Sequence, residues 1–561
     1  MITKITDSNL INKKTLIREF FIRKIPLSIT LIFLTVLESC TTIILSLSIG
    51  NYYEILGSRH STKDQLMQKL HITLPHDPKT FFIAFAIIVI VKLCLQFTSK
   101  YFSELLASSF TLSLQNKLFR HHLKMNIIDF AKKPVGKYLL RYSGDINSIR
   151  HYLIRGVFHF ISDCFFLLIS LAVLLSFDIT ITLLIIAGLT IGFFLFIFLN
   201  SKLKKIQILH RNMLSSNLHF VNEGLKAIIT FKLFNKEYSI IKKYKKRTDK
   251  LMGVNKQYIF FESVNHALPH ALLSFTLLSV FIVHLHFFMG GSALSGESFI
   301  PCILLIILMF PIYHRFLEVS PVWQAGNISF IKIAAILNLP IEEDQSEIEF
   351  LPTKGLIEFN NVSFSYSGGK PLLINCNFCF CPGQINQLHG NYKSTILKLI
   401  LGLYTPDSGS ILFDGVDANL FSKKSIRNSI AFISEEVPLC GSTILRCLYL
   451  KNNEYNRTRA LELLQLLNYS NNSSGEIIDL DAKIGEQGKY LSKSQYKKLI
   501  IARALLSDKA IILVDDALES LEADAQSNIA KLLYQLKDTH TIIVAGKVIT
   551  ENKNLLFLRA S

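Results

Sequence analysis

Six long, almost wholly apolar segments lie before residue 320 of this chain. They fall at about 25–50, 80–98, 157–177, 179–200, 267–290 and 299–318. A helix needs about 20 mainly apolar residues to cross the hydrocarbon core of a bilayer. The pattern therefore predicts an α-helical polytopic membrane domain of six transmembrane helices, with a tight hairpin around Asp178.

Between the apolar segments the chain keeps a helical periodicity but becomes strongly basic. The stretch before residue 25 and the regions 99–156 and 201–260 are rich in Lys and Arg, whereas the connection at 290–298 has neither. Basic segments favour the cytoplasmic side. We therefore expect a multi-pass protein of the plasma (inner) membrane, with long cytoplasmic helical extensions and with its N-terminus and C-terminal domain in the cytoplasm. The basic loop at 51–79 fits this rule less well.

The composition changes abruptly after Pro340. An acidic run, which extends from Glu342 to Glu349, is typical of a linker. Beyond it, β-rich runs such as 357–366 and 510–515 alternate with helical runs such as 394–404 and 494–506, which is the pattern of an α/β domain. We expect a membrane domain at 1–340, a linker at 341–354 and a nucleotide-binding domain at 355–561.

Composition supports a bilayer as the solvent of the first domain. Half of the 561 residues are apolar and only 18% are charged, and the mean hydropathy is +0.36. The net charge of +18 could indicate nucleic acid, but the basic residues lie beside apolar spans, so we expect a lipid bilayer and no nucleic acid as partner. The nine cysteines form no closely spaced framework and indicate reduced thiols, and zinc at Cys376, Cys379 and Cys381 is disfavoured because no second ligand pair lies nearby.

Three short motifs of the second domain carry its chemistry. Gly390, Lys393, Ser394 and Thr395 stand in a turn that enters a helix. In a P-loop, backbone N–H groups surround phosphate oxygens, the Lys reaches the β and γ phosphates, and the next hydroxyl binds magnesium. Alone, such a turn is a weak signal and is more typical of an ordinary helix N-terminus. About one hundred residues later come the run 491–495 (LSKSQ) before a helix and an apolar strand ending at Asp515 and Asp516.

In this order the motifs resemble those of the ATP-binding cassette (ABC) exporters, over nearly the whole chain. The opening strand 357–366, the segment 405–415 after the P-loop helix, and the two regions 130–145 and 223–237 are similar to the corresponding parts of that family. The resemblance implies ATP and Mg²⁺ as cofactors. It also implies roles for individual residues. Tyr366 would stack on adenine, Ser394 and Asp515 would contact magnesium, Ser492 and Gln495 would make the signature contact, and the phosphates would be bound by Gly390, Lys393, Ser394 and Thr395. Asp516 stands at the general-base position, and Glu435 stands where the family has the glutamine that contacts magnesium and the attacking water.

The departures from the family pattern concentrate on phosphate-facing positions. The P-loop is about three residues short and has Tyr392 where the family has Gly, which leaves fewer N–H donors able to approach phosphate. Glu435 adds negative charge, and the general-base position has Asp516 in place of Glu, one methylene shorter. The remaining departures are Lys493 and Ser494 for two signature glycines, Glu522 for an aspartate, and Gly546 for the switch histidine.

These departures predict weak nucleotide binding and crippled hydrolysis by this chain alone. The first hypothesis is therefore a subunit of an ATP-driven exporter that is the impaired half of a heterodimer, paired with an intact ATPase. The alternative is a non-transporting pseudo-ATPase membrane protein with a sensor, immunity or assembly role; a soluble kinase on an anchor is disfavoured by six spans. Five ionisable residues lie within or near the spans: Glu38, Lys92, Asp163, His284 and His286. They are candidates for a substrate path. Alternatively, Lys92 and the two histidines are ordinary groups at the membrane interface.

Overall fold

The computed structural model describes residues 11–57, 77–289, 296–342, 346–366, 369–449, 456–470, 478–516, 523–546 and 555–557. It divides into two compact units. Unit 1 comprises Met1–Arg120 and Val135–Asn338, and unit 2 comprises His121–Pro134 and Leu339–Ser561. Each unit is described by itself below.

Unit 1 consists of helices, and six of the described helical stretches are long and apolar enough to cross a membrane. The prediction of six spans is therefore confirmed. Two short π-helical turns, at Arg141–Asp145 and Ile154–His159, interrupt the stretch that leads into α8. The helices are α1 (Lys13–Arg23), α2 (Ile25–Gly57), α4 (Pro78–Lys124, whose last turn belongs to unit 2), α6 (Val135–Leu140), α7 (Ile146–Leu153), α8 (Phe160–Phe177), α9 (Ile179–Lys226), α10 (Ile228–Leu233), α11 (Glu237–Met289), α12 (Gly296–Leu317) and α13 (Val319–Leu337).

The hairpin between α8 and α9 turns on a single residue. Asp178 has an extended backbone (φ −155°), and its Oδ1 accepts hydrogen bonds from the backbone N–H groups of Thr180 (2.6 Å) and Ile181 (3.0 Å). A side-chain acceptor at this position satisfies N–H groups that have no partner inside the helix. Asp178 therefore ends one span and begins the next, as the sequence predicts.

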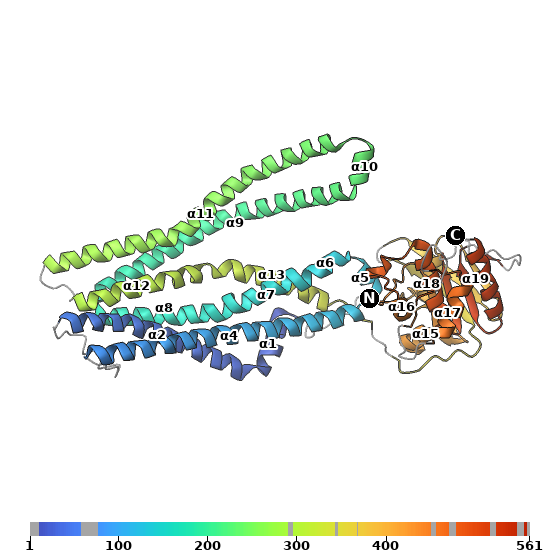
Figure 1. The fold of residues 1–561 in the computed structure, drawn as a ribbon, viewed down its shortest axis with the longest axis horizontal. Coiled ribbons are helices and arrows are strands. Elements are labelled where there is room, and N and C mark those ends of the chain that lie inside the picture. Colours follow the sequence, from blue (N-terminus) through green and yellow to red (C-terminus); the bar gives the residue numbers. More distant parts are fainter. Residues whose placement is uncertain are drawn as a thin grey trace. The chain divides into compact units, whose positions relative to one another are not determined.

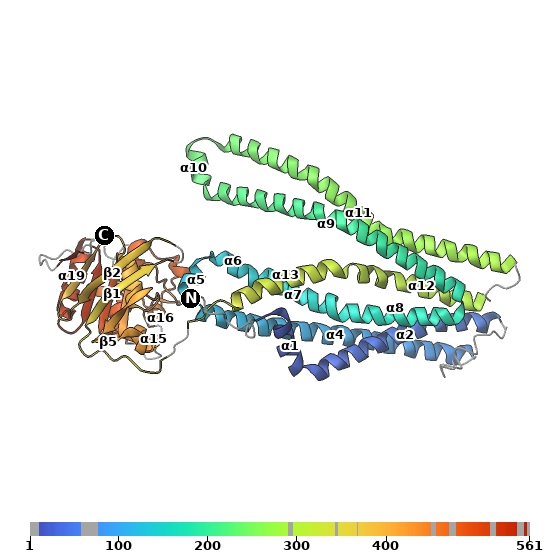
Figure 2. The same cartoon turned by 180° about the vertical axis from the view of Figure 1, so that it is seen from behind.

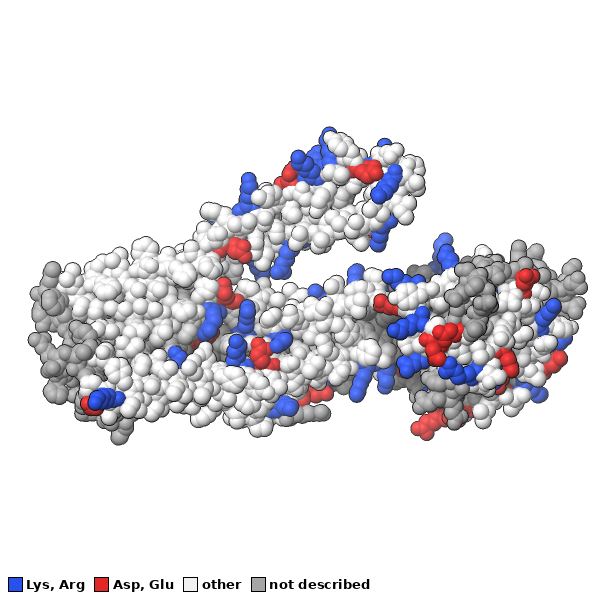
Figure 3. Space-filling view, viewed as in Figure 1, with Lys and Arg blue, Asp and Glu red and all other residues white. Residues whose placement is uncertain are grey.

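Helices α9 and α11 lie side by side, and the short helix α10 joins their far ends (Figures 1 and 2). Within unit 1 this pair extends away from the bundle formed by the other long helices (Figure 1). Figure 3 shows Lys and Arg gathered over the α10 end of the pair, whereas a long part of the same face of unit 1 carries few charges. This distribution is the one that the positive-inside rule describes for a membrane protein.

Unit 2 is an α/β domain with two sheets. The larger sheet has five parallel strands in the order β6-β7-β8-β3-β9, and the smaller is antiparallel in the order β2-β1-β4-β5. Every residue of β7 and β8 is buried, which explains why these strands are continuous apolar runs. The strands are β1 (Ile357–Ser365), β2 (Pro371–Phe380), β3 (Ile385–His389), β4 (Ser408–Phe413), β5 (Val416–Asp417), β6 (Ile430–Ser434), β7 (Ile511–Asp515), β8 (Thr541–Ala545) and β9 (Leu555–Phe557).

The helices of unit 2 connect these strands, and the labelled elements can be followed in Figures 1 and 2. They are α14 (Lys393–Ile400), α15 (Lys423–Ser429), α16 (Ile444–Leu448), α17 (Arg457–Leu466), α18 (Lys493–Leu505) and α19 (Ala523–Leu536). The expected fold class, a polytopic helical membrane domain followed by an α/β nucleotide-binding domain, is confirmed.

A short helix from the first half of the sequence belongs to unit 2. α5 (Ile127–Ala131) is capped by Asn126, whose side chain accepts from the N–H of Ile128 at 3.0 Å. Ile128 packs against the core that contains Phe359 and Phe413. The chain at Lys124 also meets the later sequence, because its carbonyl accepts from the N–H of Glu342 at 2.6 Å. Residues 121–134 are therefore held by the α/β domain.

Candidate functional site

The P-loop sequence lies where β3 ends and α14 begins. Its neighbours in the parallel sheet are β8 and, beyond it, β7, so the carboxyl ends of three strands meet at this edge. Ligands of open α/β sheets bind at such an edge. Gly390 has φ +122°, which a side chain would disfavour, and the turn then reaches Tyr392, the residue before the first turn of α14. The sequence thus places Gly390, Lys393, Ser394 and Thr395 together at the expected edge.

Two carboxylates at the end of β7 face the start of α14. Ser394 Oγ donates to Asp515 Oδ1 at 2.9 Å, and Lys393 Nζ lies 2.9 Å from Asp516 Oδ1. Asp515 is 7% exposed, whereas the Asp516 side chain is half exposed. Asp516 has a left-handed backbone (φ +46°). A hydroxyl beside a buried carboxylate is the kind of hard oxygen pair that suits Mg²⁺.

The pKa of the Asp515 carboxyl is raised above its usual range. Burial is the main cause, and the nearby negative charges of Asp516 and Glu436 act in the same direction. The hydrogen bond from Ser394 and the positive charge of Lys398 oppose it. A carboxylate that is costly to ionise when alone is stabilised by a bound cation.

Tyr366 lies next to the P-loop helix. Its hydroxyl is 3.2 Å from Thr395 Oγ1, and its ring meets the rings of Phe364 and Tyr404 edge-on at centroid distances of 5.3 and 5.6 Å. The residue is 40% exposed. An exposed aromatic ring held edge-on in this way can stack on a base.

The signature motif forms the start of α18. Ser492 Oγ accepts from the N–H of Gln495 at 3.1 Å, and Gln495 Oε1 accepts from the N–H of Ser492 at 2.8 Å. This reciprocal pair is a capping box. Gln495 also donates to the carbonyl of Ser470 at 2.7 Å. Ser492 and Gln495 therefore have structural roles at this helix start, with neighbours different from those of the P-loop residues.

Glu435 follows β6 and forms an ion pair with Lys497 of α18. The side chain of Lys497 is only 10% exposed. The negative charge that Glu435 adds is therefore offset by a lysine of the same domain, which the sequence analysis did not foresee. The two residues are 62 positions apart, so no local pattern could have indicated the pair.

At the position of the switch histidine, Gly546 directly follows β8. Its carbonyl accepts from Gln387 Nε2 at 3.0 Å, and its φ is +123°. It has no side chain to offer a proton acceptor. Glu522, which stands where the family has an aspartate, lies outside the described residues.

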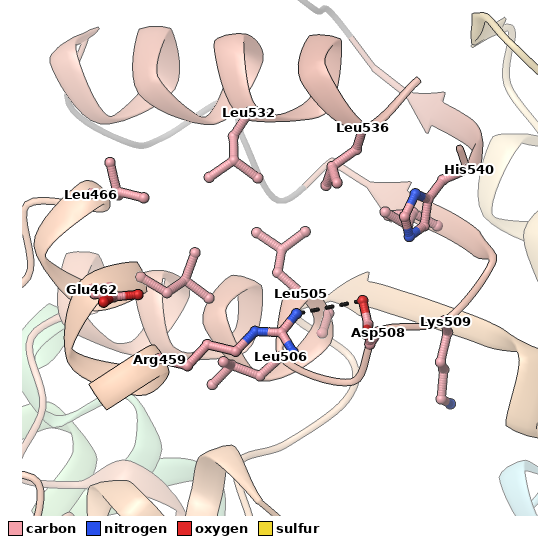
Figure 4. A pocket seen from close by; sticks show the side chains of 13 residues that line it. Arg459, Glu462, Leu466, Leu505, Leu506, Asp508, Lys509, Leu532, Leu536 and His540 are labelled. Atoms are coloured by element: carbon pink, nitrogen blue, oxygen red, sulfur yellow. Dashed lines mark hydrogen bonds and ion pairs between the residues drawn. The ribbon is translucent and has the colours of Figure 1, made fainter. Parts of the chain in front are cut away.

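A separate cavity of about 190 Å³ lies among α17, α18 and α19. Leucines, including Leu505, Leu532 and Leu536, project into it, and Arg459 and Asp508 form an ion pair (3.4 Å) at its rim (Figure 4). None of the predicted site residues lines this cavity.

In unit 1 two of the predicted ionisable groups have specific partners. Glu38 accepts from Ser99 Oγ at 2.6 Å, and the buried Asp163 accepts from Arg315 at 2.6 Å. The ring of His284 stacks on Phe299 with centroids 3.8 Å apart. Sequence reasoning missed Ser99 and Arg315, because nothing in their local sequence distinguishes them from other polar residues at the ends of the spans.

Comparison with known proteins agrees with this geometry. Residues 28–312 match the ABC transporter transmembrane region, and residues 373–519 match the ABC transporter family. The chain belongs to the ABC transporter family. With one membrane region and one nucleotide-binding domain it is an exporter half-transporter, a multi-pass membrane protein that moves a substrate across the membrane as part of a dimer.

Several relatives illustrate the range of the family. The half-transporter is 25% identical to an ATP-dependent lipid A-core flippase of Haemophilus influenzae over 83% of this chain and 80% of the relative. It is 25% identical to the alpha-hemolysin translocation ATP-binding protein HlyB of Escherichia coli, over 84% of this chain and 67% of that protein. A solved bacterial Atm1-family ABC exporter with ATP bound has the same fold, with a TM-score of 0.73, 16% identity and coverage of 93% of this chain and 90% of the other.

Nucleotide-binding domains of this family bind ATP and Mg²⁺. The groups at the sheet edge fit such a ligand in part. Lys393 and the N-terminus of α14 would hold phosphates, Ser394 and the buried Asp515 would hold the metal ion, and Tyr366 would stack on the base. ATP with Mg²⁺ supplies the free energy for transport in this family.

Proposed function

We propose that this chain is the catalytically impaired half of a heterodimeric ABC exporter. Its own P-loop residues hold nucleotide weakly, and its signature residues Ser492 and Gln495 complete the ATP site of an intact partner. The observation that carries this proposal is the pair Lys393 and Asp516. The residue at the general-base position is one methylene shorter than glutamate and forms an ion pair with the phosphate-binding lysine.

Two of the departures follow neighbouring strands, and the scaffold around them is intact. Asp516 and Gly546 follow adjacent strands of the parallel sheet, β7 and β8. Hydrolysis depends on placing a base, a water and a phosphate within a fraction of an ångström, so a shortened base and a missing histidine reduce the rate together. By contrast, the capping box of Ser492 and Gln495 is complete. Although Lys493 and Ser494 replace two signature glycines, the retained Ser492 and Gln495 support a chain that offers its signature face to a partner rather than a catalytic site of its own.

In a homodimer, each nucleotide would lie between two altered surfaces. In a heterodimer with an intact ATPase, the partner's P-loop would face α18 of this chain and one working site would remain. We place the N-terminus and unit 2 on the cytoplasmic side of the plasma (inner) membrane. Lys and Arg gather over the α10 end of the α9–α11 pair (Figure 3), and an even number of spans separates α10 from the N-terminus and from unit 2. The flippase and the hemolysin translocator named above have a lipid and a protein cargo, and either class is compatible with this half-transporter.

The test measures binding and hydrolysis by the purified chain. We expect saturable binding of a fluorescent ATP analogue with Mg²⁺ that Lys393→Ala abolishes, and no hydrolysis above that of the Lys393→Ala control. Turnover at about 1 per second or faster, the lower range of typical enzymes, would show that the chain is a competent ATPase and would sink the proposal. Absence of binding would make it a pseudo-ATPase that contributes only its signature face.

A further inference from the structure

Two consecutive glutamates stand at the end of β6, and each binds a lysine of a different helix. Glu435 pairs with Lys497 of α18, and Glu436 Oε2 lies 2.6 Å from Lys398 Nζ of α14. The strand before them is buried and paired with β7, where Ser434 is opposite Asp515. The backbone N–H of Glu436 also donates to Ser434 Oγ at 3.2 Å. The position of this acidic pair is therefore set by the central sheet.

The lysine side chains are largely buried and the glutamates are exposed. The side chains of Lys497 and Lys398 are 10% and 17% exposed, against 55% and 61% for Glu435 and Glu436. A buried ammonium group is costly unless a counter-charge accompanies it. The burial of the two lysines on α14 and α18 therefore depends on the glutamates, whereas the exposed glutamates do not need the lysines to be solvated.

α18 also holds the residues that follow the acidic pair. Arg503 donates to the carbonyls of Val437 (3.1 Å) and Pro438 (3.0 Å), and Tyr496 Oη accepts from the N–H of Leu439 at 3.4 Å. Tyr496 and Arg503 are seven positions apart, so they share one side of α18, and Lys497 lies about 100° around the helix from Tyr496. Residue 435 and residues 437–439 are thus held by this helix.

Each helix begins with residues of the proposed function. α14 begins at Lys393 and Ser394, and α18 begins with the capping box of Ser492 and Gln495. A displacement of α14 would act on Glu436 through Lys398, and the adjacent Glu435 would transmit it to α18. A chain of packed, ion-paired groups of this kind is a physical route for coupling, provided that both ends respond to its removal.

The geometry points to Glu435 and Glu436 as a bridge that couples the P-loop helix to the signature helix, with Lys497 as the positioning residue that fixes Glu435 to α18. This inference rests on the proposed function, because it gives the chain a means to pass the state of its own weak nucleotide site to the signature offered to the partner. It gives Glu435 a role different from the contact with magnesium and water that its position in the family implies.

The experiment measures amide hydrogen exchange in the full-length chain in nanodiscs, without nucleotide. We expect Lys497→Met to speed exchange about tenfold in three places: the first turns of α18, segment 435–439, and the start of α14. The charge reversal Glu435→Lys with Lys497→Glu should restore protection to within about twofold, and Lys497→Arg should retain it. A purely local packing role for Lys497 would not be rescued by reversing the charges.

Lys498→Met is the matched control. Lys498 is a neighbouring buried lysine of the same helix, and its Nζ donates to the carbonyl of Asn468 at 2.8 Å. Its loss should loosen α18 and leave exchange in 435–439 and α14 unchanged. If Lys497→Met behaves like Lys498→Met, or the charge reversal fails to restore protection, the bridge is disproved. Hydrolysis by the chain alone would overturn the proposed function but would not alter these exchange rates, so the two failures can be told apart.

Discussion

Lys393 Nζ lies 2.9 Å from Asp516 Oδ1, so the lysine that would bind phosphate already has a carboxylate partner in the same domain. The lysine side chain is 23% exposed and the aspartate side chain 50% exposed. Incoming phosphate must displace this partner or share the lysine with it. We therefore expect the ion pair to weaken nucleotide binding by competition and by adding a negative charge beside the phosphates.

Removing that competitor should strengthen nucleotide binding. Ion pairs of this exposure contribute about 0.2–1 kcal/mol, so we expect Asp516→Asn to raise the affinity for a fluorescent ATP analogue by a factor of about 1.4 to 5. Asn also tolerates the left-handed backbone found at residue 516. Asp508→Asn is the control, because Asp508 has a similar backbone (φ +50°) and pairs with Arg459 away from the P-loop. Weaker binding in Asp516→Asn would mean that Asp516 contributes to the site.

We expect the buried carboxylate of Asp515 to lower the stability of the domain while it serves Mg²⁺ binding. Its folded pKa is raised by burial above the unfolded value of about 3.9, so the ionised form lowers the free energy of unfolding at neutral pH. This destabilisation disappears as the pH falls through the raised pKa. Asp515→Asn, whose Oδ1 can still accept from Ser394, should therefore unfold at a higher temperature than the parent chain at pH 7.

The difference in unfolding temperature between Asp515→Asn and the parent chain should shrink on acidification and vanish below about pH 4. Mg²⁺-dependent nucleotide binding should be lost in the same variant. Thermal melts at several pH values, without nucleotide, measure the first effect. A constant difference at all pH values would show that the carboxyl does not titrate as inferred.

Tyr366 should contribute through its ring rather than its hydroxyl. We expect Tyr366→Ala to lower the affinity for the ATP analogue about tenfold, since stacking on a base is worth about 1–3 kcal/mol. Tyr366→Phe loses only the contact with Thr395 Oγ1 and should stay within about twofold of the parent chain. Tyr534→Ala removes an exposed tyrosine of α19 as a control. Equal losses in Tyr366→Ala and Tyr534→Ala would rule out a specific role for Tyr366.

Periodicity and hydropathy are local signals, and the features that they determine were predicted well. The six spans, the turn at Asp178, the strand ending at Asp515 and the helix that begins after Ser492 all lie where the sequence predicted them. What could not be predicted joins distant positions. Glu435 with Lys497, and Ile128 with the core around Phe359, depend on which surfaces meet after folding. Neither pairing leaves a pattern in the surrounding residues.

The ion pair of Asp163 and Arg315 in the membrane unit allows a test of whether Arg315 has a structural role or a cargo-binding role. Asp163 is 5% exposed in its side chain and Arg315 58%, so only the carboxylate needs its partner in order to be buried. Arg315→Leu should lower the free energy of unfolding by about 2 kcal/mol, a value reduced from the full cost of a broken buried pair because the arginine is solvated. The double variant with Asp163→Asn should recover most of the loss. Thermal midpoints in one detergent measure both, and Arg150→Leu, which breaks an exposed pair with Glu104, is the control. An Arg315→Leu protein as stable as the parent would mean that the carboxylate does not need this arginine, which would leave Arg315 available to a cargo.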